Sequence, residues 1–267
     1  MKYFDAHCHV QFDPYDADRI DVLNRMISQQ VGGMVVGVDL DSSVNALRLV
    51  ETLPNFYAAA GLHPNYVLDE RFDEDSFRAL LRHPKMVAVG ECGLDNFRPE
   101  DPERAKPEQR RVFERHIALA AEADKPLMVH SRPSKGTQDS YRDMIDILRT
   151  HKAEHGDRLR GDIHFFVGGV EEARDFLELG FTLSFTAVLT FARDYDEVVR
   201  YLPLESILTE TDAPYVAPAR IRGQRNEPVS VIDVVEAIAG IRGEEPETVR
   251  AAVLENAERL FGLPKTG

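Results

Sequence analysis

The segment YFDAHCHV, residues 3–10, decides how this sequence is interpreted. Side chains two apart on a β-strand point the same way, so His7 and His9 are expected on one face and Cys8 on the other. A pair of core histidines is the alternative, but each would need a polar partner, and Val or Leu would fill a core at lower cost. The pair therefore predicts half a metal site, and Cys8 is interpreted as a small apolar filler.

Seven further segments have the composition of strands, and most are followed by a stretch with helical periodicity. The expected strands are Tyr3–Val10, Gly33–Val38, Phe56–Leu62, Met86–Cys92, Pro126–His130, Gly161–Phe166, Phe181–Ala187 and Ile207–Thr211. Eight alternations of strand and helix favour an α/β fold, a closed parallel (β/α)8 TIM barrel, formed as a single domain by residues 1–267.

Four more strands end in a carboxylate or an imidazole, and the carboxyl ends of barrel strands meet on one face. Six such groups at one place would be electrostatically costly without a cation, and six ligands are too many for one tetrahedral ion. The sequence therefore predicts two divalent metal ions, zinc, magnesium or manganese, that share one carboxylate, Glu91. The predicted ligands are His7, His9, Glu91, His130, His164 and Asp212.

The other histidines carry weaker signals. His63 ends the third expected strand and should face the same mouth, either supporting a ligand or contacting substrate. His151 and His155 have i, i+4 spacing but lack a glutamate after the first histidine and precede strand six, so they are interpreted as surface helix. His116 is expected to pack at the boundary of its helix.

The composition limits the classes of function. A formal charge of −14 disfavours a dedicated nucleic-acid-binding domain and binding to anionic membranes, although bound cations would leave a polyanionic substrate open. Only two cysteines are present, and no run of 18 apolar residues occurs. A cytoplasmic monomer without membrane contact is expected.

Two stretches are expected to be irregular and to lie on the same face as the predicted site. One runs from Asn96 to Pro107 with three prolines, and the other runs from Ala213 to Pro228. The second contains Arg220, Arg222 and Arg225, each of which is more often a solvated surface charge than a functional group.

Short motifs at the expected strand ends resemble those of the TatD family of metal-dependent deoxyribonucleases, within the amidohydrolase-like barrels. The resemblance extends over essentially the whole chain. It is carried by DAHCH (5–9), GLHP (61–64), GECGLD (90–95), VHSR (129–132), ETDAPY (210–215), RNEP (225–228) and ENA (255–257) with Phe261. One departure follows the third of these motifs, where Asn96-Phe97 stands in place of the usual aromatic pair.

The resemblance implies how the ligands divide between two ions. His7, His9 and Asp212 would hold one ion, His130 and His164 would hold the second, and Glu91 would bridge them. Members of the family cleave DNA as exonucleases or endonucleases, some cleave RNA, and others are described only as hydrolases.

The resulting expectation is a phosphodiesterase that acts on DNA, with RNA or a small ester as other substrates. Asp212 and Glu91 are the predicted catalytic residues, with Asp212 as the base. His63, Arg132 and Arg225 are the predicted substrate contacts. Two alternatives remain: a metal-dependent hydrolase of a carbonyl substrate such as an amide, a lactone or an aminoacyl ester, and a metal-binding barrel without activity.

Overall fold

In the computed structural model, which describes residues 1–97, 99 and 101–265, eight parallel strands lie in sequence order and each is hydrogen-bonded to the next. The strands are β1 (Tyr3–Cys8), β2 (Val31–Val36), β3 (Phe56–Ala60), β4 (Met86–Asp95), β5 (Leu127–Arg132), β6 (Gly161–Ile163), β7 (Phe181–Phe185) and β8 (Ile207–Thr209). The helices are α1 (Arg19–Ser28), α2 (Leu40–Val50), α3 (Glu74–Leu80), α4 (Pro102–Ala123), α5 (Asp139–His155), α6 (Val170–Glu178), α7 (Asp196–Tyr201), α8 (Val231–Arg242) and α9 (Pro246–Phe261). The predicted (β/α)8 barrel is confirmed.

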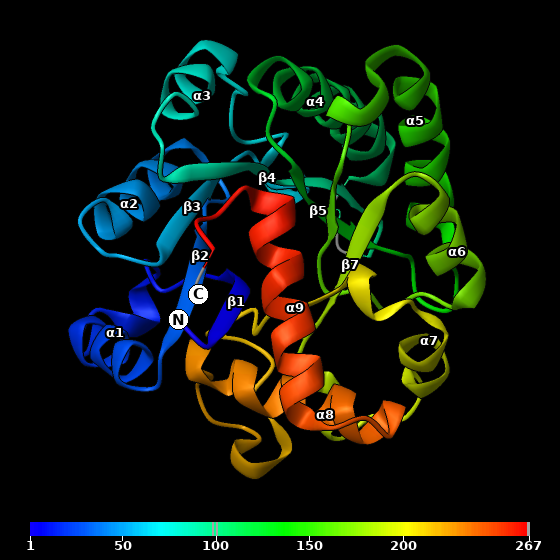
Figure 1. Cartoon of the computed structure of the whole chain (residues 1–267). Helices are drawn as coiled ribbons and strands as arrows, with labels where there is room; N and C mark the ends of the chain where they lie inside the picture. The colour runs from blue at the N-terminus through cyan, green and yellow to red at the C-terminus, as the bar shows by residue number, and fades with distance from the viewer. Residues whose placement is uncertain (98, 100, 266–267) are drawn as a thin grey trace.

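The last helix covers the end of the barrel at which the strands begin. Figure 1 looks onto this end, with α9 lying across it and the earlier helices arranged around the strands. Lumen residues such as Phe4, Met34 and Met128 form one apolar cluster with Leu260 and Phe261 of α9. The lumen is therefore filled with side chains at this end and leaves only the other end for a site.

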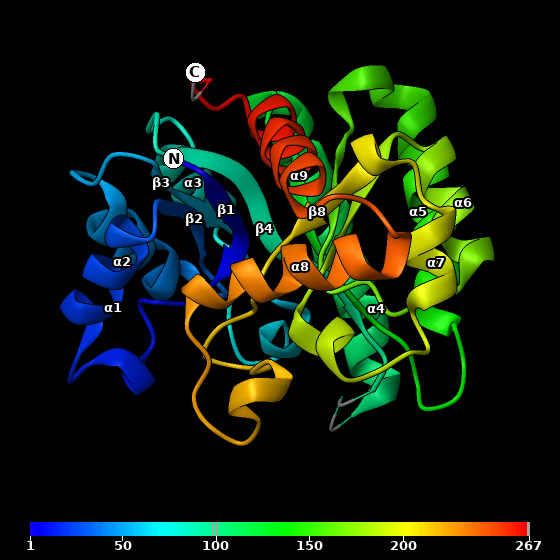
Figure 2. The same cartoon turned by 60° about the horizontal axis from the view of Figure 1, so that its bottom comes forward.

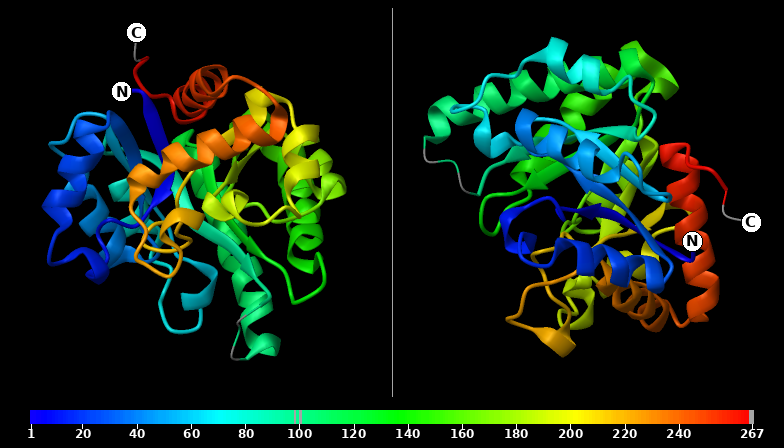
Figure 3. Two further views of the ribbon diagram at one scale, coloured as in Figure 1. Left: turned by 90° about the horizontal axis from the view of Figure 1, so that it is seen from below. Right: turned by 90° about the vertical axis from the view of Figure 1, so that its left-hand side faces the viewer.

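The opposite end carries the connections that follow the strands. Figures 2 and 3 show both termini at one end, whereas the start of α4 and the segment between β8 and α8 lie at the other. This is the face on which the sequence places the predicted ligands. Within the described residues, no helix is both long enough and apolar enough to cross a bilayer.

The barrel closes between β1 and β8 mainly through polar contacts. The buried carboxylate of Asp5 accepts hydrogen bonds from the backbone N–H of His7 and from both the N–H and the hydroxyl of Thr211. The N–H of Asp212 donates to the carbonyl of His7 at 2.9 Å. These bonds fix the end of β1 against the residues that follow β8, so both predicted contributions to one metal ion are held together.

A register shift interrupts the pairing of β1 with β2 between Asp5 and Cys8. Within the shifted stretch, Ala6 belongs to the lumen cluster, whereas Cys8 at its end belongs to the cluster that includes the helices, as predicted for Cys8. Such a shift re-aims the side chains that follow it, so His7 faces the lumen although it directly follows Ala6. A second register shift in β4 accompanies Glu91.

The strands of the structure differ from the predicted ones by up to three residues at their ends, and two of the differences from the predicted boundaries have a clear cause in the backbone. The sixth strand ends at Ile163, because Phe165 has a left-handed backbone with φ of 48° that cannot continue a strand. The stretch expected to be irregular up to Pro107 is helical from Pro102 onward. Pro102 occupies the first turn, where no N–H is needed, and Pro107 leaves only one carbonyl on an exposed turn without its helical partner.

Candidate metal centre

The carboxylate of Glu91 lies at the middle of a group of histidines at the carboxyl ends of the strands. Its Oε2 is 3.4 Å from Nε2 of His7, and its Oε1 is 2.9 Å from Nδ1 of His130 and 3.3 Å from Nε2 of His164. The Glu91 side chain is only 4% exposed. Side chains from β1, β4, β5 and the end of β6 therefore meet in one cluster that is largely shielded from solvent.

His9 and Asp212 extend this group toward β8. Nε2 of His9 lies 3.1 Å from Nε2 of His7 and 3.5 Å from Oδ1 of Asp212. The other ring nitrogen, Nδ1 of His9, lies 2.8 Å from the carbonyl oxygen of Val36, to which it donates. That hydrogen bond leaves the lone pair on Nε2, directed at the neighbouring donors, as a metal-ligating histidine requires.

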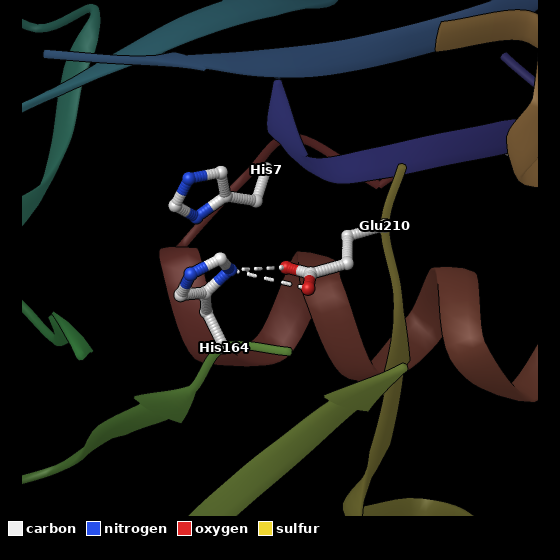
Figure 4. Close-up of side chains that lie close together, drawn as sticks. All are labelled: His7, His164 and Glu210. Carbon is white, nitrogen blue, oxygen red and sulfur yellow. Dashed lines mark hydrogen bonds and ion pairs between the residues drawn. The ribbon is translucent and has the colours of Figure 1, made fainter. Parts of the chain in front are cut away.

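The ring of His164 is held in the same manner by a carboxylate. Nδ1 of His164 lies 3.2 and 3.3 Å from the two oxygens of Glu210, and Figure 4 shows these two contacts as dashed lines. Glu210 is fully buried. Glu210 also accepts the N–H of Phe165 at 2.7 Å. The ring of His164 stacks on that of His7 with centroids 3.8 Å apart, and its Nε2 faces Glu91.

His63 lies on the outer side of Glu91, with Nε2 3.4 Å from Oε1. Its Nδ1 accepts the N–H of Asn65 at 3.1 Å. Burial lowers the pKa of His63 to about 3, so the ring is neutral near pH 7 and its proton is on Nε2. This tautomer makes Nε2 a hydrogen-bond donor, which suits a contact to a substrate oxygen better than metal ligation.

His130 contacts two carboxylates. Besides Glu91, it reaches Asp95, whose Oδ2 lies 3.1 Å from Nε2 of His130. Asp95 is buried, and its carboxylate also accepts from the side-chain amide of Asn65 and from the N–H of Phe97. Asp95 therefore fixes the orientation of the His130 ring and links it to the loop that follows β4.

The spacing of these donors fits a divalent cation. Two ligands on a tetrahedral ion with bonds of about 2.1 Å lie about 3.4 Å apart. Separations of 2.9 to 3.8 Å join Glu91 to His7, His9, His130 and His164. In addition, Nδ1 of His7 is buried and has no hydrogen-bond partner among the described residues. Imidazole nitrogen together with carboxylate oxygen is a donor set for zinc, manganese and similar ions.

The charges of the group support the same interpretation. Burial opposes ionisation of Glu91, but the surrounding histidines hold its pKa well below the usual value. Burial likewise opposes protonation of His164, yet Glu210 and Glu91 raise its pKa well above normal. Burial also opposes protonation of His9, but Asp212 raises its pKa. The carboxylates therefore stay negative and stabilise positive charge between them, whether it is carried by protons or by cations.

The structure brings the six predicted ligands and His63 together, and it shows each of the two predicted arginines in contact with other side chains of the protein. The guanidinium of Arg132 lies over the ring of Phe97, 4.3 Å from its centroid. The guanidinium of Arg225 forms two hydrogen bonds of 2.7 Å with Asp18 and one of 3.2 Å with Glu227. These pairs give Arg225 a structural role in holding the loop after β8, and its contact with substrate stays a prediction.

Sequence reasoning missed the residues that orient the ligands. Glu210 and Asp95 both lie within the motifs quoted above, but only packing shows that they bind His164 and His130. His116, predicted to be a packing residue on the apolar side of its helix, is fully buried, and its Nε2 accepts the N–H of Leu62 at 3.0 Å. His116 therefore supports the residue immediately before His63.

His151 and His155 form a separate group with Glu154 at the end of α5. This end of α5 precedes β6 and lies away from the centre around Glu91, as the sequence predicts.

A (β/α)8 barrel with clustered histidines and carboxylates at the carboxyl ends of its strands has the site of a metal-dependent enzyme, and the relatives of this chain are metal-dependent hydrolases. A family model described as "TatD related DNase" matches residues 4–262, and the chain belongs to this family. It is 36% identical over 264 residues to the uncharacterized metal-dependent hydrolase YabD of Bacillus subtilis, covering 97% of this chain and 99% of that protein. It is 35% identical over 274 residues to the uncharacterized metal-dependent hydrolase TatD of Mycobacterium tuberculosis, covering 97% of each. The crystal structure of the TatD homologue YjjV from Escherichia coli aligns with a TM-score of 0.88 and 29% identity, covering 98% of this chain and 99% of that one.

Proposed function

We propose that this chain hydrolyses phosphodiester bonds in DNA with the help of two divalent cations. The observation that carries the proposal is the convergence of histidines from several strands on the single carboxylate of Glu91. The description of the matching family as related to a DNase supports DNA as the substrate.

The residues divide naturally between two positions. His7, His9 and Asp212 would hold one cation, and His130 and His164 would hold the other, with Glu91 shared by both. When bound, the two cations stabilise negative charge that develops on the phosphoryl oxygens and lower the pKa of a bound water.

Asp212 is the proposed acceptor of the proton from water. The carboxylate of Asp212 directs Oδ1 to His9, which leaves Oδ2 for the water. Its side chain is 15% exposed, compared with 4% for Glu91, so solvent reaches Asp212 more readily. Although burial opposes ionisation, His9 lowers the pKa of Asp212, so the group is a carboxylate at neutral pH and can accept a proton.

His63 is the proposed donor to the substrate. Its Nδ1 is occupied by the N–H of Asn65, so Nε2 carries the proton and can donate to a phosphoryl oxygen. His116 holds the preceding backbone N–H, that of Leu62, which limits the movement of His63. Donation from a neutral ring stabilises the developing charge without a change in protonation state.

The test is a cleavage assay on single-stranded DNA with protein that has been stripped by a chelator and reloaded with manganese, magnesium or zinc. We expect activity only with metal, and a fall in kcat of about 100- to 10,000-fold in Asp212→Asn. Asp157→Asn, an exposed carboxylate on the turn that precedes β6, serves as the matched control and should be unchanged. Activity that survives both chelation and Asp212→Asn would refute the proposal.

A second candidate function is hydrolysis of a carbonyl substrate such as an amide, a lactone or an aminoacyl ester. The net charge of −14 favours it, because an acidic protein repels a polyanion. Turnover of neutral esters together with no cleavage of DNA would select this candidate. Stoichiometric metal binding without turnover of either substrate class would indicate a barrel that is not an enzyme.

A further inference from the structure

Exposed aromatic side chains are concentrated at the metal end of the barrel. The described residues include five phenylalanines and tyrosines that stand out as exposed, and four of them follow β3, β4, β7 and β8. These four are Tyr66, Phe97, Phe191 and Tyr215. The fifth, Tyr201, ends α7. Scattered exposed aromatics need no explanation, but a concentration around one site is typical of a binding surface.

Two of these rings carry an arginine on one face. The guanidinium of Arg132 lies 4.3 Å from the ring centroid of Phe97, and that of Arg222 lies 3.9 Å from the ring centroid of Phe191. Phe97 nevertheless remains 46% exposed and Phe191 38% exposed. Each pair therefore keeps a large apolar surface in water beside a positive charge.

The first pair is connected to the metal centre through short stretches of chain, and the second lies where the loops after β7 and β8 meet. Phe97 comes two residues after Asp95, which orients His130, and Arg132 comes two residues after His130 itself. Phe191 directly follows the 3-10 turn after β7, and the hydroxyl of the preceding residue, Thr190, accepts a hydrogen bond from the loop that contains Arg222. The first pair thus belongs to β4 and β5, the second to β7 and β8, and β6 lies between them.

Arg222, the arginine of the second pair, differs from the other two arginines of its loop in its contacts. Arg220 is paired with Asp233 and Arg225 with Asp18, whereas Arg222 forms no ion pair with a described carboxylate and packs on Phe191. A guanidinium that stacks through its face keeps its N–H donors in the plane of the guanidinium, directed outward. Those donors can bind a phosphate while the neighbouring ring surface binds a base.

We propose that the Phe97–Arg132 and Phe191–Arg222 pairs are two nucleobase-stacking positions for a single-stranded polynucleotide, on either side of β6 at the metal end of the barrel. The inference rests on the proposed phosphodiesterase function and deepens it, because it names the residues that distinguish a polynucleotide from a small ester. Stacking on aromatic rings recognises every base, so the strand is bound without sequence preference.

The test compares binding of two fluorescein-labelled strands, decathymidylate and an equally long strand of abasic nucleotides, both with phosphorothioate linkages that slow cleavage. Anisotropy is measured with the manganese-loaded protein. We expect the wild type to prefer decathymidylate, and Phe97→Ala and Phe191→Ala each to reduce its affinity by about 5- to 150-fold while leaving the abasic strand unchanged. Phe97→Tyr and Phe191→Tyr should retain the preference, and Tyr201→Ala is the matched control.

Hydrolysis of bis(p-nitrophenyl) phosphate separates this inference from the proposed function, because that substrate is too small to need the stacking positions. If the alanine variants lose the preference for decathymidylate but still hydrolyse bis(p-nitrophenyl) phosphate, the result supports both the stacking positions and the proposed function. Decathymidylate preference in a protein that hydrolyses no phosphodiester would support the stacking positions and reject the proposed function. Equal affinity of the wild type for the two strands, or unchanged affinity in both alanine variants, overturns the inference.

Discussion

Replacing Glu210 with glutamine should weaken metal binding because Glu210 orients the ring of His164. The carboxylate accepts the proton on Nδ1 of His164, so the lone pair of Nε2 faces Glu91. It also accepts the N–H of Phe165 at 2.7 Å and the hydroxyl of Ser184 at 3.0 Å. All of these bonds use oxygen as the acceptor, and glutamine keeps only one oxygen.

The magnitude follows from those contacts. If the amide nitrogen of the introduced glutamine faces His164, the ring must carry its proton on Nε2 and loses its ligand lone pair. If the amide oxygen faces His164 instead, the bond remains but its acceptor is neutral, and the loss is about 1 kcal/mol, the difference between a hydrogen bond to a charged group and one to a neutral group. Loss of a carboxylate that orients a metal-ligating histidine typically costs about 10- to 100-fold in affinity, which is the expected effect of Glu210→Gln.

The assay is competition for zinc or manganese against a chromophoric chelator at about pH 7.5, on the alkaline side of the usual histidine pKa. Glu172→Gln is the matched control, because Glu172 is also largely buried but accepts the N–H of Gly169 at the start of α6, a role that glutamine fills as well. Wild-type affinity in a Glu210→Gln protein that melts normally would show that His164 does not depend on this carboxylate and would refute the reasoning.

Three further predictions concern pH and charge. Burial lowers the pKa of His116 to about 4, so below about pH 6.5 the unfolded chain binds a proton that the folded chain does not. The free energy of unfolding should therefore fall by about 3 kcal/mol from pH 6.5 to pH 4 through this residue. Urea titrations of His116→Gln should show a shallower fall. Burial opposes protonation of His9 and His164, but Asp212 raises the pKa of His9 and Glu210 raises that of His164, so bound protons compete with metal. Metal affinity, measured by competition with a chelator, should therefore rise as the pH increases above about 6.5. A flat profile between about pH 6 and pH 8 would contradict this. Finally, Arg225→Gln should lower the melting temperature and leave KM for DNA unchanged, since its guanidinium is paired with carboxylates; a raised KM at unchanged stability would instead restore its predicted substrate role.

The sequence predicts the barrel and the meeting of the six ionisable residues at one end of it, because both depend on local patterns. Apolar strands alternate with amphipathic helices, and the strand ends carry the ionisable residues, such as Glu91 and His130. The features that the sequence does not predict depend on contacts between residues far apart in the chain. The register shifts that re-aim His7 and Glu91 depend on pairing with neighbouring strands, and the bond between Glu210 and His164 joins residues 46 positions apart. Helix α4 extends through Pro107 because an exposed turn tolerates one missing bond, which composition alone does not indicate.

The position of α9 has a consequence for how the chain acquires its structure. Leu260 and Phe261 complete the apolar cluster that fills the end of the lumen where the strands begin, and this cluster includes residues as early in the chain as Phe4. A nascent chain therefore keeps its first strands incompletely packed until this final helix has left the ribosome. Removing α9 should expose the apolar lumen residues at the end of the barrel that α9 covers, and the barrel should aggregate even though it retains every proposed metal ligand.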